Sequence, residues 1–254
     1  MRWCLAICLA LWSAVAPAQA EDIVLGLSQD EVAITASFDG SEILIFGAIK
    51  RDGPIPDGPP VEVIVTVAGP LKPIVVRRKE KRFGIWVNTD AVEIDAAPSF
   101  YAVATSAPLT DVLKDVEDLR HHISIPRAIR SVGAPMSISD APSFTDALIR
   151  IRETQSQFQL LENQVAVDEQ TLFRTRVTLP AALTEGDYPT RIYLTREGEV
   201  ISSYETVIDV KKVGLERWLY TMSRENALLY GLMSLAIAIA AGWGASAAFS
   251  IFRP

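Results

Sequence analysis

The sequence predicts a mainly β protein: an immunoglobulin-like sandwich, a second β-rich part with two helices, and one C-terminal transmembrane helix. Three observations lead to this fold class. Short runs between residues 23 and 107 alternate apolar and polar side chains, which is the two-residue period of a strand. After residue 108 the apolar spacing becomes helical before the alternation returns. Residues 227–252 contain no charged side chain.

The composition favours one membrane anchor on a soluble ectodomain. The chain has 254 residues, 49% of them hydrophobic, and a mean hydropathy of +0.22. These values are high for a soluble protein and low for one that crosses a membrane many times. The formal net charge is −7 and the sequence pI is about 5.0. Because there is no excess of lysine and arginine to neutralise phosphates, the sequence predicts no nucleic-acid partner.

Residues 1–20 are predicted to form a secretory signal peptide. A positively charged start at Arg2 precedes an apolar run, and Ala18-Gln19-Ala20 is a small-residue cleavage motif before Glu21. Both cysteines, Cys4 and Cys8, lie in this segment. The mature chain is therefore expected to contain no disulfide, no thiol nucleophile and no cysteine-bound metal.

Residues 21–107 are predicted to form the sandwich domain. Asp39-Gly40 is a turn dipeptide, and residues 52–60 hold four prolines and two glycines and form a loop. About seven short runs of β-branched and aromatic residues without a helix are typical of an immunoglobulin-like sandwich. The cysteine pair and core tryptophan pattern of antibody domains are missing from the sequence, so the prediction concerns the architecture alone. The later runs lie at 61–67, 74–78, 83–87 and 100–105.

Residues 108–213 are predicted to form the second part, which contains two helices. Apolar residues recur at helical spacing from Leu109 to Ile123, opposite an acidic face, and Pro126 ends this first helix. A second helix begins at Ser143, a favourable N-cap residue. A connector joins the two helices.

Strands return after the second helix. Residues 172–179 alternate, and the runs 188–195 and 200–210 flank a hairpin turn. A domain boundary is placed near residue 108. One large sandwich with a helical insertion is the alternative.

The C-terminal region is predicted to contain a juxtamembrane helix at 214–226, a transmembrane helix at 227–252 and a tail at 253–254. The uncharged run is 26 residues long, and roughly 20 helical residues cross the hydrocarbon core of a bilayer. Only a helix satisfies the backbone of a single span in lipid. We expect the juxtamembrane helix to continue into the membrane helix without a break.

Three stretches together resemble an uncharacterised family of alphaproteobacterial transmembrane proteins. They read VAITASFDGSEILIFGAI at 32–49, GDYPTRIYLTREGEVI at 186–201 and ENALLYGLMSLAIAIAAGWGASAAF at 225–249. The resemblance covers essentially the whole mature chain. It implies a bacterial origin and a topology but no catalytic residues, and it suggests sulfite-exporter-type permeases as companions.

The predicted signal peptide and this resemblance together place the protein in the bacterial inner membrane. The ectodomain is expected in the periplasm and the C-terminus in the cytoplasm. The charges flanking the span oppose the positive-inside rule, since four cations between Lys211 and Arg224 exceed Arg253 alone. Translocation led by the signal peptide is expected to prevail, because long domains cross regardless of such charges.

Small residues form two series within the predicted membrane helix. Fourteen of the 26 residues are Gly, Ala or Ser, and small residues at a spacing of four let another helix approach closely. A plain alanine-rich anchor is the alternative. The predicted helix-packing residues are Ser234, Ala238, Gly242, Ser246 and Ser250 in one series and Ala236, Ala240, Gly244 and Ala248 in the other.

Basic residues form a second candidate site, which is a patch for a small anion or a lipid head group. A solvated hairpin tip and ion pairs with the acidic helix are the alternatives. Arg150 and Arg152 also flank the connector. The candidate residues of the anion patch are Arg77, Arg78, Lys79, Lys81, Arg82, Arg127 and Arg130.

The sequence offers little for metal binding or catalysis. His121 and His122 are the only histidines, and their pairing at i, i+4 with Glu117 and Asp118 supplies fewer ligands than a zinc site needs. A nucleophile elbow, a phosphate-binding loop and a zinc-protease motif are all missing from the sequence. We therefore expect no cofactor and a non-catalytic binding or accessory module for another membrane protein, reached through the membrane helix. Self-association, a sensor of a small anion, and a hydrolase with paired carboxylates are the alternatives.

Overall fold

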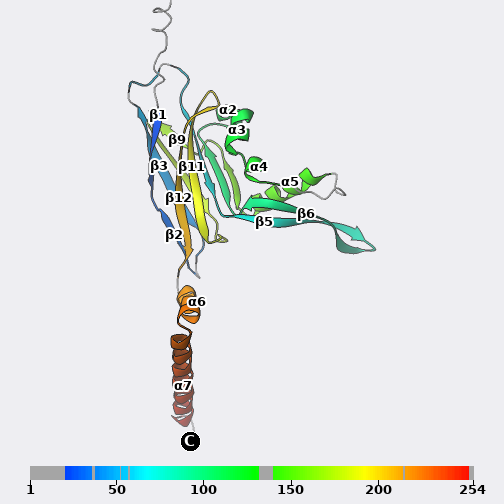
Figure 1. Ribbon diagram of the computed structural model, residues 1–254, viewed down its shortest axis with the longest axis vertical. Coiled ribbons are helices and arrows are strands. Elements are labelled where there is room, and N and C mark those ends of the chain that lie inside the picture. Colours follow the sequence, from blue (N-terminus) through cyan, green and yellow to red (C-terminus); the bar gives the residue numbers. More distant parts are fainter. Residues whose placement is uncertain are drawn as a thin grey trace, which may run out of the picture.

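The computed structural model describes residues 21–35, 38–51, 53–56, 58–131, 140–213 and 215–251. The predicted signal peptide, the tail at 253–254 and part of the predicted connector lie outside these ranges. The predicted mainly β fold and the single C-terminal apolar helix are confirmed (Figure 1).

Two sheets form the body of the ectodomain. All neighbouring strands run antiparallel except β12–β2 and β7–β8, which are parallel. The four-stranded sheet has the order β1 (Glu21–Leu27), β3 (Ser41–Arg51), β10 (Leu172–Leu179), β9 (Ala166–Asp168). The six-stranded sheet has the order β2 (Glu31–Ile34), β12 (Glu199–Lys212), β11 (Gly186–Arg196), β4 (Glu62–Ala68), β7 (Tyr101–Thr105), β8 (Phe158–Leu161).

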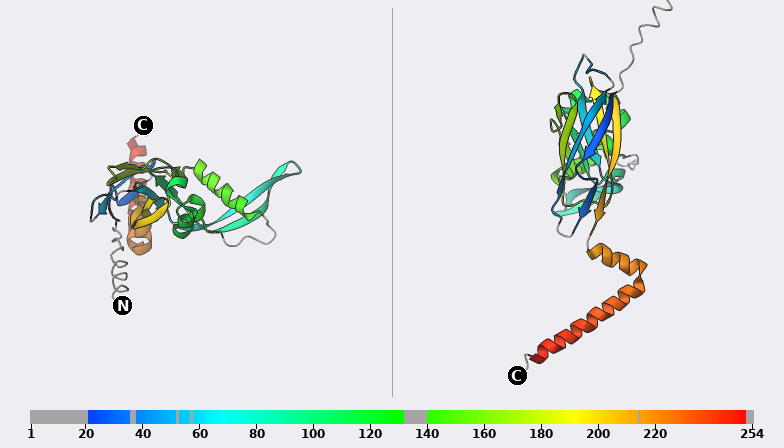
Figure 2. Two further views of the ribbon diagram at one scale, coloured as in Figure 1. Left: turned by 90° about the horizontal axis from the view of Figure 1, so that it is seen from above. Right: turned by 90° about the vertical axis from the view of Figure 1, so that its left-hand side faces the viewer.

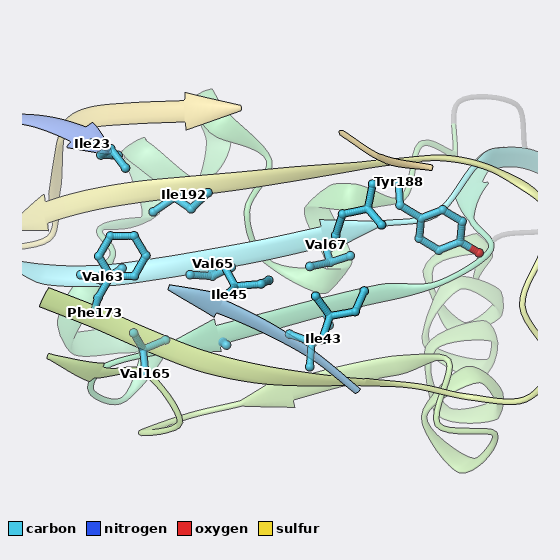
Figure 3. Close-up of a cluster of buried hydrophobic side chains, with 14 of the residues drawn as sticks. Ile23, Ile43, Ile45, Val63, Val65, Val67, Val165, Phe173, Tyr188 and Ile192 are labelled. Atoms are coloured by element: carbon cyan, nitrogen blue, oxygen red, sulfur yellow. The ribbon is translucent and has the colours of Figure 1, made fainter. Parts of the chain in front are cut away.

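The main core lies between these two sheets. Alternate residues of each strand point inward, so that Ile43 and Ile45 of β3 face Val63 and Val65 of β4 (Figure 3). Strand β10 shows the predicted alternation at every position, because one of its faces meets the core and the other meets solvent. Tyr188 is fully buried at one end of this core.

Strands from both sides of residue 108 share this core. Strand β10 pairs with β3, and β11 pairs with β4. The boundary predicted near residue 108 therefore does not separate two cores. The pairing fits the alternative expectation of one large sandwich with a helical insertion, because each sheet needs strands from both parts to bury its inner face.

A second core covers the outer face of the six-stranded sheet. Ile64 and Val103 face outward from β4 and β7 and pack against four short helices and the base of a hairpin. Strand β4 is consequently buried on both faces, which explains its continuous apolar run. The helices are α2 (Leu109–Val112), α3 (Asp115–His121), α4 (Ile125–Ala128) and α5 (Ala141–Thr154).

The single helix predicted from Leu109 onward is interrupted between α2 and α3. Leu113 adopts an extended conformation, with φ −143° and ψ 121°. The backbone N–H of Lys114 donates to the carbonyl of Gly198 at 2.9 Å, in the turn between β11 and β12. This contact with the sheet replaces an intrahelical hydrogen bond, and the helix restarts one residue later.

The interruption changes which side of α3 faces the core. Val116 and Leu119, predicted on the apolar stripe, are 66% and 56% exposed. Glu117, predicted on the solvent face, is only 7% exposed. The predicted helical face is therefore wrong for α3, because a periodicity counted across the break assigns its second half to the opposite side.

Helix α5 begins slightly before the predicted position. Asp140 occupies the N-cap position, and Ala141 is the first helical residue. Ser143, predicted as the N-cap, instead donates its hydroxyl to the Asp140 carbonyl at 2.8 Å. Of the apolar stripe that helical spacing predicts for this helix (Phe144, Ala147, Leu148 and Ile151), Phe144 and Leu148 are buried, whereas Ile151 is 48% exposed.

Strands β5 (Leu71–Arg82) and β6 (Ile85–Pro98) form a two-stranded hairpin that leaves the body of the ectodomain (Figures 1 and 2). The sequence predicted two short, separate runs at 74–78 and 83–87. The hairpin is much longer than these runs, since its backbone stays paired as far as Arg82 and Ile85. The prediction was too short because the outer part of the hairpin carries charges and few alternating apolar residues.

A buried ion cluster joins the two sheets at one edge. Arg51 Nε of β3 donates to Glu21 Oε1 at 2.7 Å, and Arg196 Nη2 of β11 lies 3.0 Å from both carboxylate oxygens. The Glu21 side chain is 3% exposed. Because Arg51 belongs to the four-stranded sheet and Arg196 to the six-stranded sheet, one carboxylate links both layers.

Two helices follow the sandwich, α6 (Leu215–Glu225) and α7 (Ala227–Ile251). The chain bends at Asn226, where the helix assignment is interrupted, and α6 meets α7 at an angle (Figure 2, right). The uninterrupted helix predicted here is therefore wrong. The amide of Asn226 still donates to the carbonyl of Met222 at 3.0 Å, so the bend retains helical hydrogen bonding.

Candidate functional site

Helix α7 lies outside the body of the protein over the part whose side chains are described, residues 227–247. Residues Ala227–Ala247 are long and apolar enough to span a membrane, and none of that window is buried within the protein. Large side chains such as Leu228 and Trp243 are exposed. A Cβ atom added to Gly242 or Gly244 would meet nothing within 4 Å. The surface that carries the predicted small-residue series is therefore open for packing by another molecule.

The two series occupy different sides of α7. A spacing of four residues advances a helix by about 40° more than one full turn, so each series winds slowly around the axis. Residues two apart, such as Ser234 and Ala236, point roughly 160° from each other. Each series can receive a separate neighbouring helix, and a spacing of four favours a right-handed crossing. The side chains of Ala248 and Ser250 lie outside the described part of the structure.

The basic residues predicted as an anion patch fall into separate places. Arg130 is joined to Ala96 of β6 by two backbone hydrogen bonds of 2.8 and 3.1 Å, at the base of the hairpin. Trp86, which pairs with Lys81 of the basic run, lies ten residues before Ala96 in β6. Ten residues of extended strand span roughly 33 Å. The guanidinium of Arg127 lies 4.0 Å from the Asp118 carboxylate. The structure therefore does not bring Arg127 and Arg130 to the basic run at 77–82.

Arg78 has a structural contact of its own. Its guanidinium donates to Asp140 at 2.5 Å and to the Ser143 hydroxyl at 2.8 Å, and it stacks 4.6 Å from the ring centroid of Phe144. The hydrogen bond from Arg78 lowers the pKa of Asp140, and the same bond raises the pKa of Arg78. Arg78 thus fastens the hairpin to α5, whereas Lys79, Lys81 and Arg82 lie beyond this attachment.

Both histidines line a shallow groove between α3 and the hairpin β11–β12. The groove has a volume of about 390 Å³. His121 lies 3.4 Å from the buried Glu117 carboxylate, the predicted i, i+4 pair, and its ring meets Tyr193 edge-on with centroids 5.5 Å apart. The groove is lined by Arg120, His121, His122, Arg191, Tyr193, Ser203, Tyr204 and Glu205.

The cations of this groove already have carboxylate partners. Arg120 donates to Glu117 at 2.6 Å, and Arg191 donates to Glu205 at 3.0 Å. The described ranges contain no group of three or more His, Cys, Asp or Glu arranged to hold a metal ion. Sequence reasoning missed the groove, because its strand residues lie about 70 to 85 positions after the histidines and only the packing of α3 on the sheet brings them together.

A comparison with curated proteins finds no match to the sequence. The model of the family described as "Putative transmembrane protein (Alph_Pro_TM)" matches residues 22–250, which include all of the β sandwich except Glu21, the helical insertion and all of α7 except Ile251. With a match of that extent, and with one apolar helix of spanning length at its C-terminal end, the chain belongs to this transmembrane protein family.

Proposed function

We propose that the protein is a single-pass accessory module that docks against another membrane protein through α7. The observation that carries this proposal is the open surface of α7, on which small residues recur every fourth position. Lipid tails are as apolar as leucine, so hydrophobicity alone does not drive helix association in a bilayer. Small residues favour it, because they let two backbones approach closely enough for dispersion contacts and weak hydrogen bonds.

The proposed orientation places the β ectodomain in the periplasm of a bacterial inner membrane and the C-terminus in the cytoplasm. The predicted signal peptide supports this direction. In this arrangement α6 lies at the outer membrane–water boundary, where the exposed Trp218 and Tyr220 suit an interfacial position. The partner is then a membrane protein whose own helix offers a complementary groove, and a sulfite-exporter-type permease is the candidate that the family resemblance suggests.

Cross-linking and detergent pull-down of the tagged full-length protein test the proposal. The double variant Ala238→Leu, Gly242→Leu fills one small-residue face and should abolish recovery of the partner, because bulky side chains hold the helices apart. Ala240→Leu with Gly244→Leu is the matched control, since these residues follow Ala238 and Gly242 by two positions and point roughly 160° away from them. Recovery of the protein alone, or equal recovery of the same partner with the double variant, would end this idea.

A second candidate function is the binding of a small anion in the histidine groove. The observation that favours it is the gathering of Arg120, Arg191 and both histidines around one hollow, in which a bound anion would replace Glu117 and Glu205 as the partner of the arginines. Calorimetry of the full-length protein in detergent with sulfite, sulfate and phosphate tests it. A saturable signal that Arg191→Gln removes is expected, and a flat titration with all three anions excludes the candidate.

A further inference from the structure

The end of the β5–β6 hairpin exposes large apolar side chains that the fold does not use. We call residues 79–88 the hairpin tip. Within it Phe83 is 106% exposed, Trp86 69% and Ile85 65%. Three large apolar side chains in four positions form a concentrated apolar end, unlike the single exposed apolar residues that are usual on protein surfaces.

Phe83 occupies a position in the turn of the hairpin tip where a phenylalanine is unusual. Phe83 and Gly84 both have positive φ, 51° and 86°, which is the geometry of a two-residue type I′ hairpin turn. Asn, Asp or Gly is preferred at the first of these positions, and a bulky residue there is disfavoured by steric contact with its own backbone. Neither turn preference nor packing within the described part of the structure explains a fully exposed phenylalanine at this position.

The tip is also strongly basic in an otherwise acidic protein. Residues 77–88 contain five basic residues and one acidic residue, whereas the whole chain has a net charge of −7. Arg78 is engaged by α5, and Arg82 lies 3.3 Å from Glu80, with both side chains largely exposed. Lys79, Lys81 and Arg82 therefore give the tip a net positive field of its own.

Basic and apolar side chains are placed side by side across the two strands. Lys81 is directly opposite Trp86, and Arg82 is directly opposite Ile85. Opposed residues on paired antiparallel strands project to the same face. Both faces of the tip thus carry one cation beside one large apolar group, which suits an interface with an apolar interior and an anionic surface.

The hairpin projects sideways from the ectodomain as an arm (Figure 1). It leaves the half of the ectodomain nearer to α6 and α7, and it extends away from the sandwich (Figure 1). From the Arg130 attachment at Ala96 to Ile85 it spans roughly 36 Å of strand. The contact of Arg78 with α5 braces the inner part of this arm, and α7 holds the ectodomain beside a bilayer.

We propose that the hairpin tip inserts Phe83, Ile85 and Trp86 into the interfacial layer of an anionic phospholipid bilayer, with Lys79, Lys81 and Arg82 contacting the head groups. Aromatic side chains are favoured at the head-group level, and cations near an anionic leaflet are attracted to it. The ectodomain then has a second membrane contact besides α7. This inference does not depend on the docking partner of α7 or on the direction in which the chain crosses the membrane.

Bromolipid quenching of Trp86 in the full-length protein tests the proposal. The chain has five tryptophans. Replacing Trp3, Trp12, Trp218 and Trp243 by phenylalanine leaves Trp86 as the only one, while the tip stays native. The protein is reconstituted in phosphatidylcholine vesicles with or without phosphatidylglycerol, and acyl-brominated lipid serves as the quencher. Strong quenching is expected with phosphatidylglycerol and weaker quenching without it.

Two sets of substitutions separate the apolar and the ionic contributions. Phe83→Asn with Ile85→Thr keeps the turn and strand preferences and should abolish quenching, because the apolar contact is lost. Changing Lys79, Lys81 and Arg82 to glutamine should lower the insertion constant in phosphatidylglycerol vesicles by roughly 100-fold, at about fivefold per cation. A chain with Trp243 as its only tryptophan should be quenched in every case, which verifies insertion of α7.

Other results would overturn the proposal. Membrane insertion is ruled out if aqueous iodide still quenches the fluorescence of Trp86 in both kinds of vesicle and the brominated lipid does not. Shielding of Trp86 that requires a co-reconstituted protein would identify the tip as a protein-docking element instead. The quenching of Trp86 could also be equal with and without phosphatidylglycerol, and unchanged when Lys79, Lys81 and Arg82 are replaced by glutamine. That result would overturn the proposed contact with anionic head groups.

Discussion

Replacing Glu21 by glutamine should loosen the sandwich at the edge where its two sheets meet. The Glu21 carboxylate holds Arg51 of β3 and Arg196 of β11 at 2.7 and 3.0 Å. Glutamine has nearly the same size but no charge, and it can accept only at one of its two terminal atoms. The guanidinium of Arg51 would then be left without a counter-ion in a site where its side chain is 7% exposed.

The expected loss of stability follows from this burial. Removing one partner of a buried ion pair typically destabilises a protein by about 3–5 kcal/mol, because the remaining charge stays out of water uncompensated. The pair with Arg196 adds less, since that side chain is 27% exposed and solvent screens it. For a domain of this size, a loss of about 3–5 kcal/mol lowers Tm by about 6–20 °C.

Differential scanning calorimetry of the full-length protein in detergent measures this change. Glu205→Gln is the matched control, because it removes a carboxylate from an arginine pair whose side chains are 44% and 55% exposed. The control should change the free energy of unfolding by less than about 1 kcal/mol. If Glu21→Gln shifts Tm no more than Glu205→Gln does, the Glu21 cluster does not hold the sheets together and the reasoning from burial fails.

Three further changes test other contacts. The hydrogen bond from Arg78 lowers the pKa of Asp140, so the stability that this contact supplies is present above the ordinary carboxyl pKa of 3.8 and is lost as the pH falls through the still lower folded-state value. Hydrogen exchange in the middle of the hairpin, around the Arg78–Asp90 pair, should rise over that acidic range, and Asp140→Asn should raise it already at neutral pH. Tyr101→Phe removes a buried hydroxyl that donates to the carbonyl of Ile123 at 2.8 Å, and it should cost about 1–3 kcal/mol in denaturant unfolding. Gly47→Ala would place a Cβ 2.5 Å from an aromatic ring of β10 and 2.6 Å from a backbone oxygen of β1, and it should lower the denaturation midpoint by an amount that corresponds to about 1–3 kcal/mol.

Local patterns predicted the strands that have one face in the core. Strand β10 alternates because every second residue meets the opposite sheet, so its sequence carries the two-residue period directly. The hairpin β5–β6 has no such face beyond its base, and its strands were predicted as short runs. Its backbone pairing extends through charged residues, and pairing of that kind leaves no hydrophobic period in the sequence.

Long-range contacts explain what the sequence could not predict. The interruption at Leu113 depends on the turn at Gly198, which lies 85 positions away in the chain and accepts the hydrogen bond from Lys114. The histidine groove depends on the same approach of α3 to the β11–β12 hairpin. The Glu21 cluster needs Arg51 and Arg196 together. In each case the partners are polar residues whose sequence positions give no periodic signal.

The candidate surfaces on α7 and on the hairpin differ in how much spacing along the sequence can show. The small-residue series of α7 needs only helical geometry, so residues such as Ala238 and Gly242 could be assigned to one face from spacing alone. The basic run can be recognised from the sequence, but spacing alone does not show that Arg130 pairs with Ala96 and that Arg127 lies near Asp118. Neither composition nor spacing showed that Arg78 would be used to brace the hairpin against α5.

A second membrane contact would change how the ectodomain serves a partner on α7. Only residues 213 and 214 separate β12 from α6, so the sandwich is joined to the membrane helix at one end. Insertion of the hairpin tip would add a second attachment and restrict the orientation of the sandwich before any partner binds, and a protein that is already ordered loses less entropy on association. Phe83→Asn should therefore reduce recovery of an α7-bound partner that also contacts the ectodomain. It should leave recovery of a partner bound through α7 alone unchanged, whereas Ala238→Leu with Gly242→Leu weakens both.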